Sequence, residues 1–382
     1  MQYGIKLTMK KPKLLIVGAF PPPGRKIFGG IVTSCRSLLD SSFSRQFELI
    51  LVDSTQVSNP PPPFAKRLWL AFARFLKYLR VLRGNRPDAV LIFASSGASL
   101  AEKGLMVRVC RLMQVPVLIF PRSGRIMDDF KISRMSRAIS RFALGGATRI
   151  LCQGKLWQDF AITDLGFKLD HAPIVPNWTA TEDLLEVGTM REYKTNSECL
   201  RFLFLGWLEH NKGIMELLAA VADLRNDYMF TLSIAGQGHA EDDVNKFIET
   251  HALQVSVSLL GWVEPENISA LMAKHDVLVL PSWAEGLPNA MVEAMATGLT
   301  VVVSAVGNIP SVIEDGKDGL LVVPRNVESL RSALESLLRD PNLLCSLAQN
   351  GHAVAKNKFS VEQASGKLTR IIHEAMVDKA FV

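Results

Sequence analysis

A chain of 382 residues with 48% hydrophobic and 21% charged residues can bury a large core, and its length favours two domains. This composition excludes a disordered polymer, and no run of about 18 apolar residues indicates a membrane span. The net charge of +6 hides an asymmetry, since residues 1–190 hold 27 Lys and Arg against 13 Asp and Glu, whereas residues 191–382 hold 16 against 24. The basic first half is therefore expected to face an anionic partner.

The five cysteines are scattered along the chain and are never spaced as Cys-x-x-Cys. An odd, dispersed set argues against a disulfide framework and against a zinc site, and it predicts a reducing compartment such as the cytoplasm. The cysteines are Cys35, Cys110, Cys152, Cys199 and Cys345.

The first half begins with an apolar run at 14–19, typical of a buried parallel strand, and a proline-rich turn follows it. Gly29 and Gly30 then open a predicted helix at 31–39. Glycines after a strand let backbone amides approach a phosphate or a sugar closely, although a tight packing turn explains them equally well. A second strand is predicted at 47–52.

Residues 64–83 predict a helix that mixes basic residues with aromatic ones such as Trp69 and Phe72. Helices of this composition lie on anionic bilayers with their aromatic rings in the interface. The alternative is a helix packed on the core with a solvated basic face. A nucleic-acid partner is not expected, because no nucleic-acid-binding motif accompanies the basic residues.

The rest of the first half alternates strands with helices, one of them at 101–113, and polar residues at about 180–199 indicate a linker. This alternation predicts a doubly wound parallel sheet. The strands are predicted at 89–93, 116–120, 148–152 and 172–175.

A second series of strands and helices follows and predicts a second doubly wound domain, so the fold class is α/β. Two such domains face to face put the loops at the carboxyl ends of their strands into one cleft. We expect a first domain at 1–185, a linker at 186–199, a second domain at 200–358, and a last helix within 359–382 that packs back on the first domain. In the second half, strands are predicted at 201–205, 230–235, 255–260, 276–280, 301–303 and 319–323, and helices at 214–224, 241–250, 267–274, 327–338, 341–356 and 361–377.

The stretch 281–298 follows a short apolar strand and has the pattern of a loop that turns into a helix. Glu285 lies on the loop, Glu293 lies inside the helix, and Pro288 has the φ of a first helical turn. The amides of a helix start favour an anion such as a diphosphate, and carboxylates at two depths suit a long polyhydroxy ligand. The alternative is a solvated loop glutamate and a helix-face glutamate with no shared role.

Four motifs in the second half stand in the order and at the spacing of one family. They are Phe204-Leu-Gly-Trp-Leu-Glu-His-Asn-Lys-Gly213, Ile234-Ala-Gly-Gln-Gly238, the pair Glu285 and Glu293, and Gly307 to Pro310 with Asp315 to Pro324. Over residues 201–338 the chain resembles the retaining glycosyltransferases of family 4, which are of the group 1 type and have a GT-B fold.

The resemblance implies a role for each matching residue. Glu285 contacts the donor sugar near the reacting carbon, Glu293 accepts hydrogen bonds from the ribose hydroxyls, and Lys212 neutralises the diphosphate, which gains negative charge as the glycosidic bond breaks. Gly29 and Gly30 match an amino-terminal loop near the acceptor and the phosphate. The other donor-binding residues are Gly206, Trp207, Gly236, Gly261, Gly286, Leu287, Pro288 and Asn289.

Three positions depart from the family pattern. Trp207 stands where members often carry an arginine, so the phosphate depends on Lys212 or on an arginine from elsewhere. Arg122 stands where many members have a catalytic-site histidine, and it is expected near the sugar, although a guanidinium stays protonated and cannot act as a general base. Ser311 replaces a common glutamate.

These implications predict a metal-independent hexosyltransferase that needs no cofactor. It would transfer a hexose, with retention, from a nucleoside diphosphate sugar to a glycan or lipid-linked acceptor. The expected setting is the synthesis of surface polysaccharide or lipopolysaccharide, in the cytoplasm or on the inner face of a membrane. Two alternatives stay open: a sugar-nucleotide epimerase on a related GT-B fold, and a non-catalytic sugar-nucleotide-binding protein.

Overall fold

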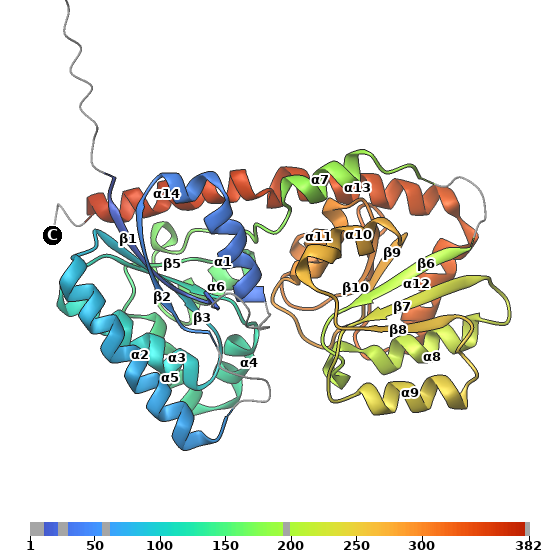
Figure 1. The fold of residues 1–382 in the computed structure, drawn as a ribbon, viewed down its shortest axis with the longest axis horizontal. Helices are drawn as coiled ribbons and strands as arrows, with labels where there is room; N and C mark the ends of the chain where they lie inside the picture. The colour runs from blue at the N-terminus through green and yellow to red at the C-terminus, as the bar shows by residue number, and fades with distance from the viewer. Residues whose placement is uncertain (1–10, 22–29, 56–61, 194–198, 379–382) are drawn as a thin grey trace, which may run out of the picture.

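A computed structural model describes residues 11–21, 30–55, 62–193 and 199–378. Within these ranges two separate parallel sheets, each flanked by helices, lie beside one another (Figure 1). Each sheet is the centre of its own domain, because helices cover its faces and bury its apolar side chains. The predicted fold class, two doubly wound α/β domains, is confirmed.

The first sheet is parallel throughout. Its strands are β1 (Lys13–Gly18), β2 (Glu48–Asp53), β3 (Ala89–Ala94), β4 (Val117–Pro121) and β5 (Arg149–Ile150). They lie in the order β2-β1-β3-β4-β5. Every residue of β3 and β4 is buried, which is the pattern of strands covered on both faces.

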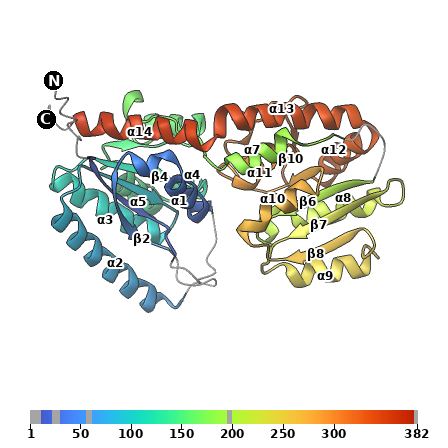
Figure 2. The ribbon, with the colours of Figure 1, turned by 45° about the horizontal axis from the view of Figure 1, so that its top comes forward.

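Helices from distant parts of the chain cover the two faces of this sheet. They are α1 (Gly30–Asp40), α2 (Phe64–Asn85), α3 (Ala98–Leu112), α4 (Arg125–Ile132), α5 (Arg134–Leu144), α6 (Lys155–Thr163) and α14 (Val361–Asp378). One apolar core joins the sheet to α2 through α6, and a second core on the opposite face joins it to α1 and α14. The first domain is therefore completed by a helix from the far end of the sequence (Figure 2).

The second sheet is also parallel. Its strands are β6 (Leu200–Leu205), β7 (Phe230–Ala235), β8 (Val257–Gly261), β9 (Val277–Leu280), β10 (Thr300–Ser304) and β11 (Leu320–Val322). They lie in the order β11-β10-β9-β6-β7-β8, so the chain runs outward from β6 through β8 and then returns to start again at β9. The boundary between β6 and β9 is the switch point at which sheets of this kind bind ligands.

The helices of the second domain are α8 (Ile214–Leu224), α9 (Glu241–Thr250), α10 (Ile268–Ala273), α11 (Asn289–Ala296), α12 (Val327–Arg339) and α13 (Pro341–Phe359). One large apolar core unites them with the sheet. Within the residues described, no helix combines the length and the apolarity that crossing a bilayer requires.

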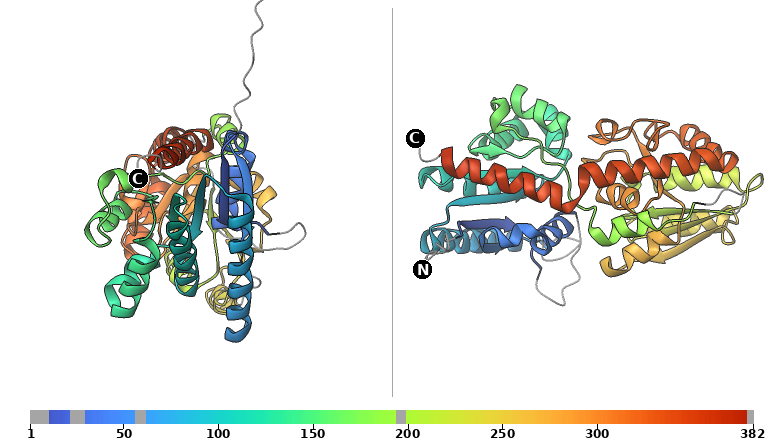
Figure 3. Two further views of the ribbon diagram at one scale, coloured as in Figure 1. Left: turned by 90° about the vertical axis from the view of Figure 1, so that its left-hand side faces the viewer. Right: turned by 90° about the horizontal axis from the view of Figure 1, so that it is seen from above.

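The chain passes between the domains at two places that lie side by side. One passage is at Ala180 and the other at Ser360, where α13 ends and α14 begins, and these two residues form a parallel bridge. Seen from above, α13 and α14 together extend over both domains (Figure 3). The two passages therefore form one narrow hinge.

Two local expectations need correction. Residues 172–175 are not a strand, because only a single bridge links Ile174 to Cys152. The polar stretch at 180–199, expected as a linker, contains α7 (Glu182–Thr189), which buries Leu184 in the core of the second domain. Polar residues on its outer side hid this short amphipathic helix from composition alone.

Candidate functional site

The two loops that carry the predicted catalytic residues flank the switch point of the second sheet. The loop after β6 contains η3 (His210–Lys212), and the loop after β9 spans 281–288. Because β6 and β9 are neighbours, their carboxyl ends bring the two loops together. The backbone N–H of Trp283 donates to the carbonyl oxygen of Asn211 at 2.9 Å, which fastens one loop to the other.

Lys212 and Glu285 meet where these loops touch. Lys212 Nζ lies 2.6 Å from Glu285 Oε1, and the two side chains are 26% and 16% exposed. Gly213 makes this approach possible, since it has a φ of +71° and an added Cβ would lie 2.0 Å from the carbonyl oxygen of Pro281. The structure therefore places a cation and a carboxylate together at the carboxyl edge of the sheet.

The start of α11 follows the 281–288 loop directly. The helix begins at Asn289, and Pro288 precedes it with an extended ψ of 128°, so Pro288 caps the helix instead of lying in its first turn as expected. Leu287 is buried, whereas Gly286 lies against the side chain of Gln153 from the first domain. The free amides at the start of α11 therefore open at the seam between the domains.

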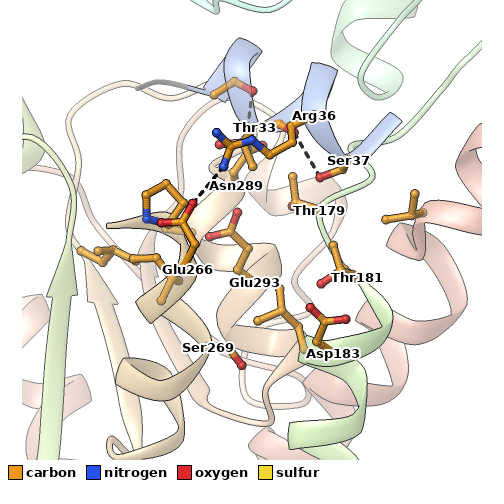
Figure 4. Close-up of a pocket in the computed structure, with 18 of the residues that line it drawn as sticks. Thr33, Arg36, Ser37, Thr179, Thr181, Asp183, Glu266, Ser269, Asn289 and Glu293 are labelled. Carbon is orange, nitrogen blue, oxygen red and sulfur yellow. Dashed lines mark hydrogen bonds and ion pairs between the residues drawn. The ribbon is translucent and has the colours of Figure 1, made fainter. Parts of the chain in front are cut away.

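Glu293 lies one turn into α11 and faces a cleft of about 880 Å³ between the domains (Figure 4). Burial raises the pKa of Glu293 from 4.5 to about 7. Gly206, Gly236 and Asn289 also line this cleft, and Gly30 lines it from the first domain. Lys212 and Glu285 are not among the residues that line this cleft.

Two tryptophans form part of the cleft wall. The rings of Trp207 and Trp262 are 5.6 Å apart between centroids and tilted by 39°. Trp207 follows Gly206, the first residue after β6, and Trp262 follows Gly261, the last residue of β8. The N–H of Gly236 donates to the carbonyl oxygen of Gly261 at 2.8 Å. Trp262 was not singled out in the sequence, and its place directly after a strand-ending glycine is the signal that could have found it.

An arginine, Arg325, lies close to the loop that carries Glu285. The guanidinium of Arg325 sits 4.2 Å from the ring centroid of Trp283, and the indole N–H of Trp283 donates to Glu216. Arg325 itself is exposed to solvent.

Arg122 points into the seam between the domains. Its guanidinium donates to Asn177 Oδ1 and to Ser34 Oγ, each at 2.7 Å, so both partners belong to the first domain. Sequence reasoning did not single out Asn177 as a site residue, because its importance arises from contacts with residues more than a hundred positions later.

Gly29 lies outside the described residues, and Gly30 is the first residue of α1. Asn289 Nδ2 donates to the carbonyl oxygen of Gly30 at 3.2 Å, so the start of α1 and the start of α11 touch. Nowhere in the described ranges do three or more His, Cys, Asp or Glu side chains gather as a metal site would require.

The comparison with known proteins locates a family in the second half. The model for glycosyl transferases group 1 matches residues 189–354. The alpha-D-kanosaminyltransferase of Streptomyces kanamyceticus is 31% identical over 45% of this chain and 45% of its own length. The lipopolysaccharide core biosynthesis glycosyltransferase LpsE of Rhizobium meliloti is 27% identical over 63% of this chain and 70% of its own length. The match thus spans less than half of the length of the kanosaminyltransferase.

The whole chain matches solved structures in fold. The structure of Anabaena HepE in complex with UDP superposes with a TM-score of 0.70 at 17% identity, over 95% of this chain and 100% of the other. The motif-bearing loops at the switch point fall inside the matched family segment. Residues 189–354 are therefore a group 1 glycosyltransferase domain, in a chain that has the GT-B fold.

Proposed function

We propose that the chain is a retaining glycosyltransferase that moves a hexose from a nucleoside diphosphate sugar to a glycan or lipid-linked acceptor. The observation that carries the proposal is the Lys212–Glu285 pair at the switch point, which the start of α11 connects to Glu293. This arrangement suits one extended ligand with an anionic diphosphate in its middle. The cation and the helix start would bind the diphosphate, and the two carboxylates would bind the hydroxyl groups on either side.

Each group would act on one part of the donor. Lys212 and the amides at the start of α11 stabilise the leaving diphosphate as its negative charge grows. Glu285 orients the sugar and forms no covalent bond to it. The departing phosphate oxygen takes the proton of the acceptor hydroxyl, which attacks from the same face, so the chain supplies neither a protein base nor an essential metal.

The cleft beside Glu293 would hold the nucleoside. Glu293 accepts hydrogen bonds from the ribose hydroxyls, and the rings of Trp207 and Trp262 offer apolar walls to a base. UDP is the first nucleotide to test, since HepE was solved with it. The name of LpsE points to lipopolysaccharide assembly as the setting.

The acceptor side would work at an anionic membrane surface. Residues 64–144 hold 16 Lys and Arg against 4 Asp and Glu. On α2, Leu68, Trp69, Phe72 and Leu76 are exposed, although Tyr78 of the same helix is fully buried in the core. An apolar stripe beside basic residues on an otherwise packed helix is the arrangement of a lipid-binding face, and a lipid-linked acceptor would be met there.

A thermal-shift panel of UDP, GDP, ADP and their sugars tests the donor assignment. We expect one nucleotide and its sugars to stabilise the wild type, and Glu293→Ala to abolish that shift. The stabilising sugar is then incubated alone and with a panel of glycan and lipid-linked acceptors. Transfer that requires an acceptor supports the proposal, whereas epimerised or hydrolysed donor without any transfer, or no shift with any nucleotide, contradicts it.

A further inference from the structure

The buried amide of Asn177 joins the two domains beside the start of α11. Its side chain is fully buried. The amide oxygen accepts from Arg122 Nη1 at 2.7 Å and from Gln153 Nε2 at 3.1 Å, both in the first domain. The amide nitrogen donates to the carbonyl oxygen of Leu287 at 2.9 Å and to Asn289 Oδ1 at 3.0 Å, both in the second.

The chemistry of these neighbours decides which way the amide faces. A guanidinium only donates and a backbone carbonyl only accepts, so the oxygen of Asn177 must face Arg122 and its nitrogen must face Leu287. All four hydrogen-bonding positions of the side chain are used. Turning the amide over would therefore set donor against donor and acceptor against acceptor in a buried place.

Arg122 is itself firmly held. Its second terminal nitrogen donates to Ser34 Oγ at 2.7 Å, and its guanidinium carbon lies 4.9 Å from the ring centroid of Phe120 and 5.6 Å from that of Trp178. Among the residues that the structure describes, no carboxylate forms an ion pair with it. Arg122 thus acts as a rigid donor that orients Asn177.

The partners of Asn177 in the second domain belong to the segment that carries Glu285. This segment approaches the first domain closely elsewhere too, since a Cβ added to Gly124 would lie 3.0 Å from the carbonyl oxygen of Glu285. Asn177 also lies three residues before the hinge bridge at Ala180. Opening the hinge would break its bonds to Leu287 and Asn289 and keep those within the first domain.

We propose that Asn177 is a positioning residue that holds the 281–288 loop and the start of α11 against the first domain, in the orientation that Arg122 imposes. The inference rests on the proposed function, because the loop carries the donor groups and the first domain carries the acceptor. The contact then sets the distance between the two substrates, on which the rate of transfer depends steeply.

The variant Asn177→Asp weakens the contact of Asn177 with the second domain and preserves its contact with the first. A carboxylate has nearly the same shape and gives Arg122 an ion pair, so the first domain keeps its support. The same change turns an N–H donor into a charged oxygen that faces the carbonyl of Leu287. The new oxygen also faces Asn289 Oδ1, and Asn289 can relieve that second repulsion only by turning its own amide over, which breaks its hydrogen bond to Gly30.

The matched control is Asn350→Asp, the same change at an exposed residue of the second domain whose amide nitrogen donates only to the carbonyl oxygen of Lys317. We compare thermal unfolding, hydrogen exchange of the amides at 285–292, and steady-state kinetics with the donor found in the panel. In Asn177→Asp we expect near-wild-type melting, faster exchange at 285–292, and a loss of at least ~10-fold in kcat with little change in the donor KM. The control should match the wild type in all three.

Wild-type exchange and kcat in a folded Asn177→Asp would overturn the proposal. Should that variant not fold, Ser34→Ala removes one anchor of Arg122 with minimal loss of volume. It should raise exchange at 285–292, and unchanged exchange there would overturn the proposal equally. A wild type that is inactive with every donor would contradict the proposed function. The test of Asn177 would still be valid in that case, because hydrogen exchange needs no substrate.

Discussion

Lys212 and Glu285 are 73 residues apart in the chain, yet their side chains meet with 2.6 Å between Nζ and Oε1. Both are largely shielded from water. Removing either partner of a shielded pair leaves the other charge uncompensated, which costs more than the pair itself contributes. A diphosphate that enters the site must therefore compete with Glu285 for Lys212, so the donor displaces an existing contact.

We predict that Lys212→Met and Glu285→Gln each lower turnover by about 10²–10³-fold, since each removes a charge that acts on the reacting part of the donor. Lys212→Met should also lower the free energy of unfolding by about 1–3 kcal/mol, because Glu285 then keeps a partly buried negative charge. The double variant should recover most of that stability and none of the turnover. Urea unfolding and steady-state kinetics on the wild type, the two single variants and the double variant complete this double-mutant cycle.

The exposed pair of Lys317 and Glu314 is the control for this cycle, with 2.7 Å between Lys317 Nζ and Glu314 Oε2. Lys317→Met should leave both the stability and the turnover essentially unchanged, because exposed ion pairs contribute little. Full turnover in both variants at positions 212 and 285, on a verified acceptor, would refute the assignment of the site.

Glu293 makes the stability of the protein depend on pH. Burial raises its pKa from 4.5 to about 7, so the folded state binds a proton that the unfolded state has released between these values. The stability that Glu293 contributes is therefore fully present below pH 4.5 and is lost as the pH rises through about 7. Glu293→Gln, which cannot ionise, should be more stable than the wild type at pH 8 by about 1–3 kcal/mol.

The measurement is the difference in unfolding free energy between wild type and Glu293→Gln across pH 4.5 to 8, because the difference cancels the other titrating groups. A constant difference at every pH would show that the carboxyl of Glu293 titrates normally.

We predict that α2 binds anionic vesicles in a salt-dependent way. Its exposed apolar residues include Leu68, Trp69 and Phe72, which are 62%, 66% and 60% exposed. Each basic residue near an anionic surface adds about 1 kcal/mol of attraction, and the aromatic rings enter the interface. Sedimentation with phosphatidylglycerol vesicles should capture the wild type at low salt, and the paired change Trp69→Ser with Phe72→Ser should release it.

Met229 and Val255 give the matching control, since they are 83% and 96% exposed but lie in the acidic second half. Changing both to Ser should leave vesicle binding intact. Equal binding to neutral phosphatidylcholine vesicles, or no binding at low salt, would refute the membrane assignment and leave α2 as a helix with a solvated outer face.

The fold could largely be predicted because periodic segments are strong local signals. The helices α8 and α9 begin and end where their apolar spacing placed them, at 214–224 and 241–250. Short polar segments were harder, since α7 is stabilised by burying Leu184 in a core that its own sequence does not reveal. The strand expected at 172–175 is wrong, because the segment makes only one isolated bridge, between Ile174 and Cys152.

The sequence predicted which loops carry the site, but it did not predict which side chains meet there. Motif spacing identified Glu285, Glu293 and Lys212, but it could not show that Lys212 and Glu285 pair, because that depends on which strands become neighbours. Asn177 carries no local signal at all. Its contact with Leu287 spans 110 residues and arises from the packing of one domain against the other.

The helix that completes the first domain, α14, follows the whole second domain in the chain. α14 supplies Leu368, Ile371 and Ile372 to the core beneath the first sheet, and Arg149 holds Glu374 and Asp378. Until α14 is made, a growing chain therefore has only α1 to cover this face of the sheet, throughout the synthesis of the second domain. The first domain can therefore complete its core only after the second domain has been synthesised.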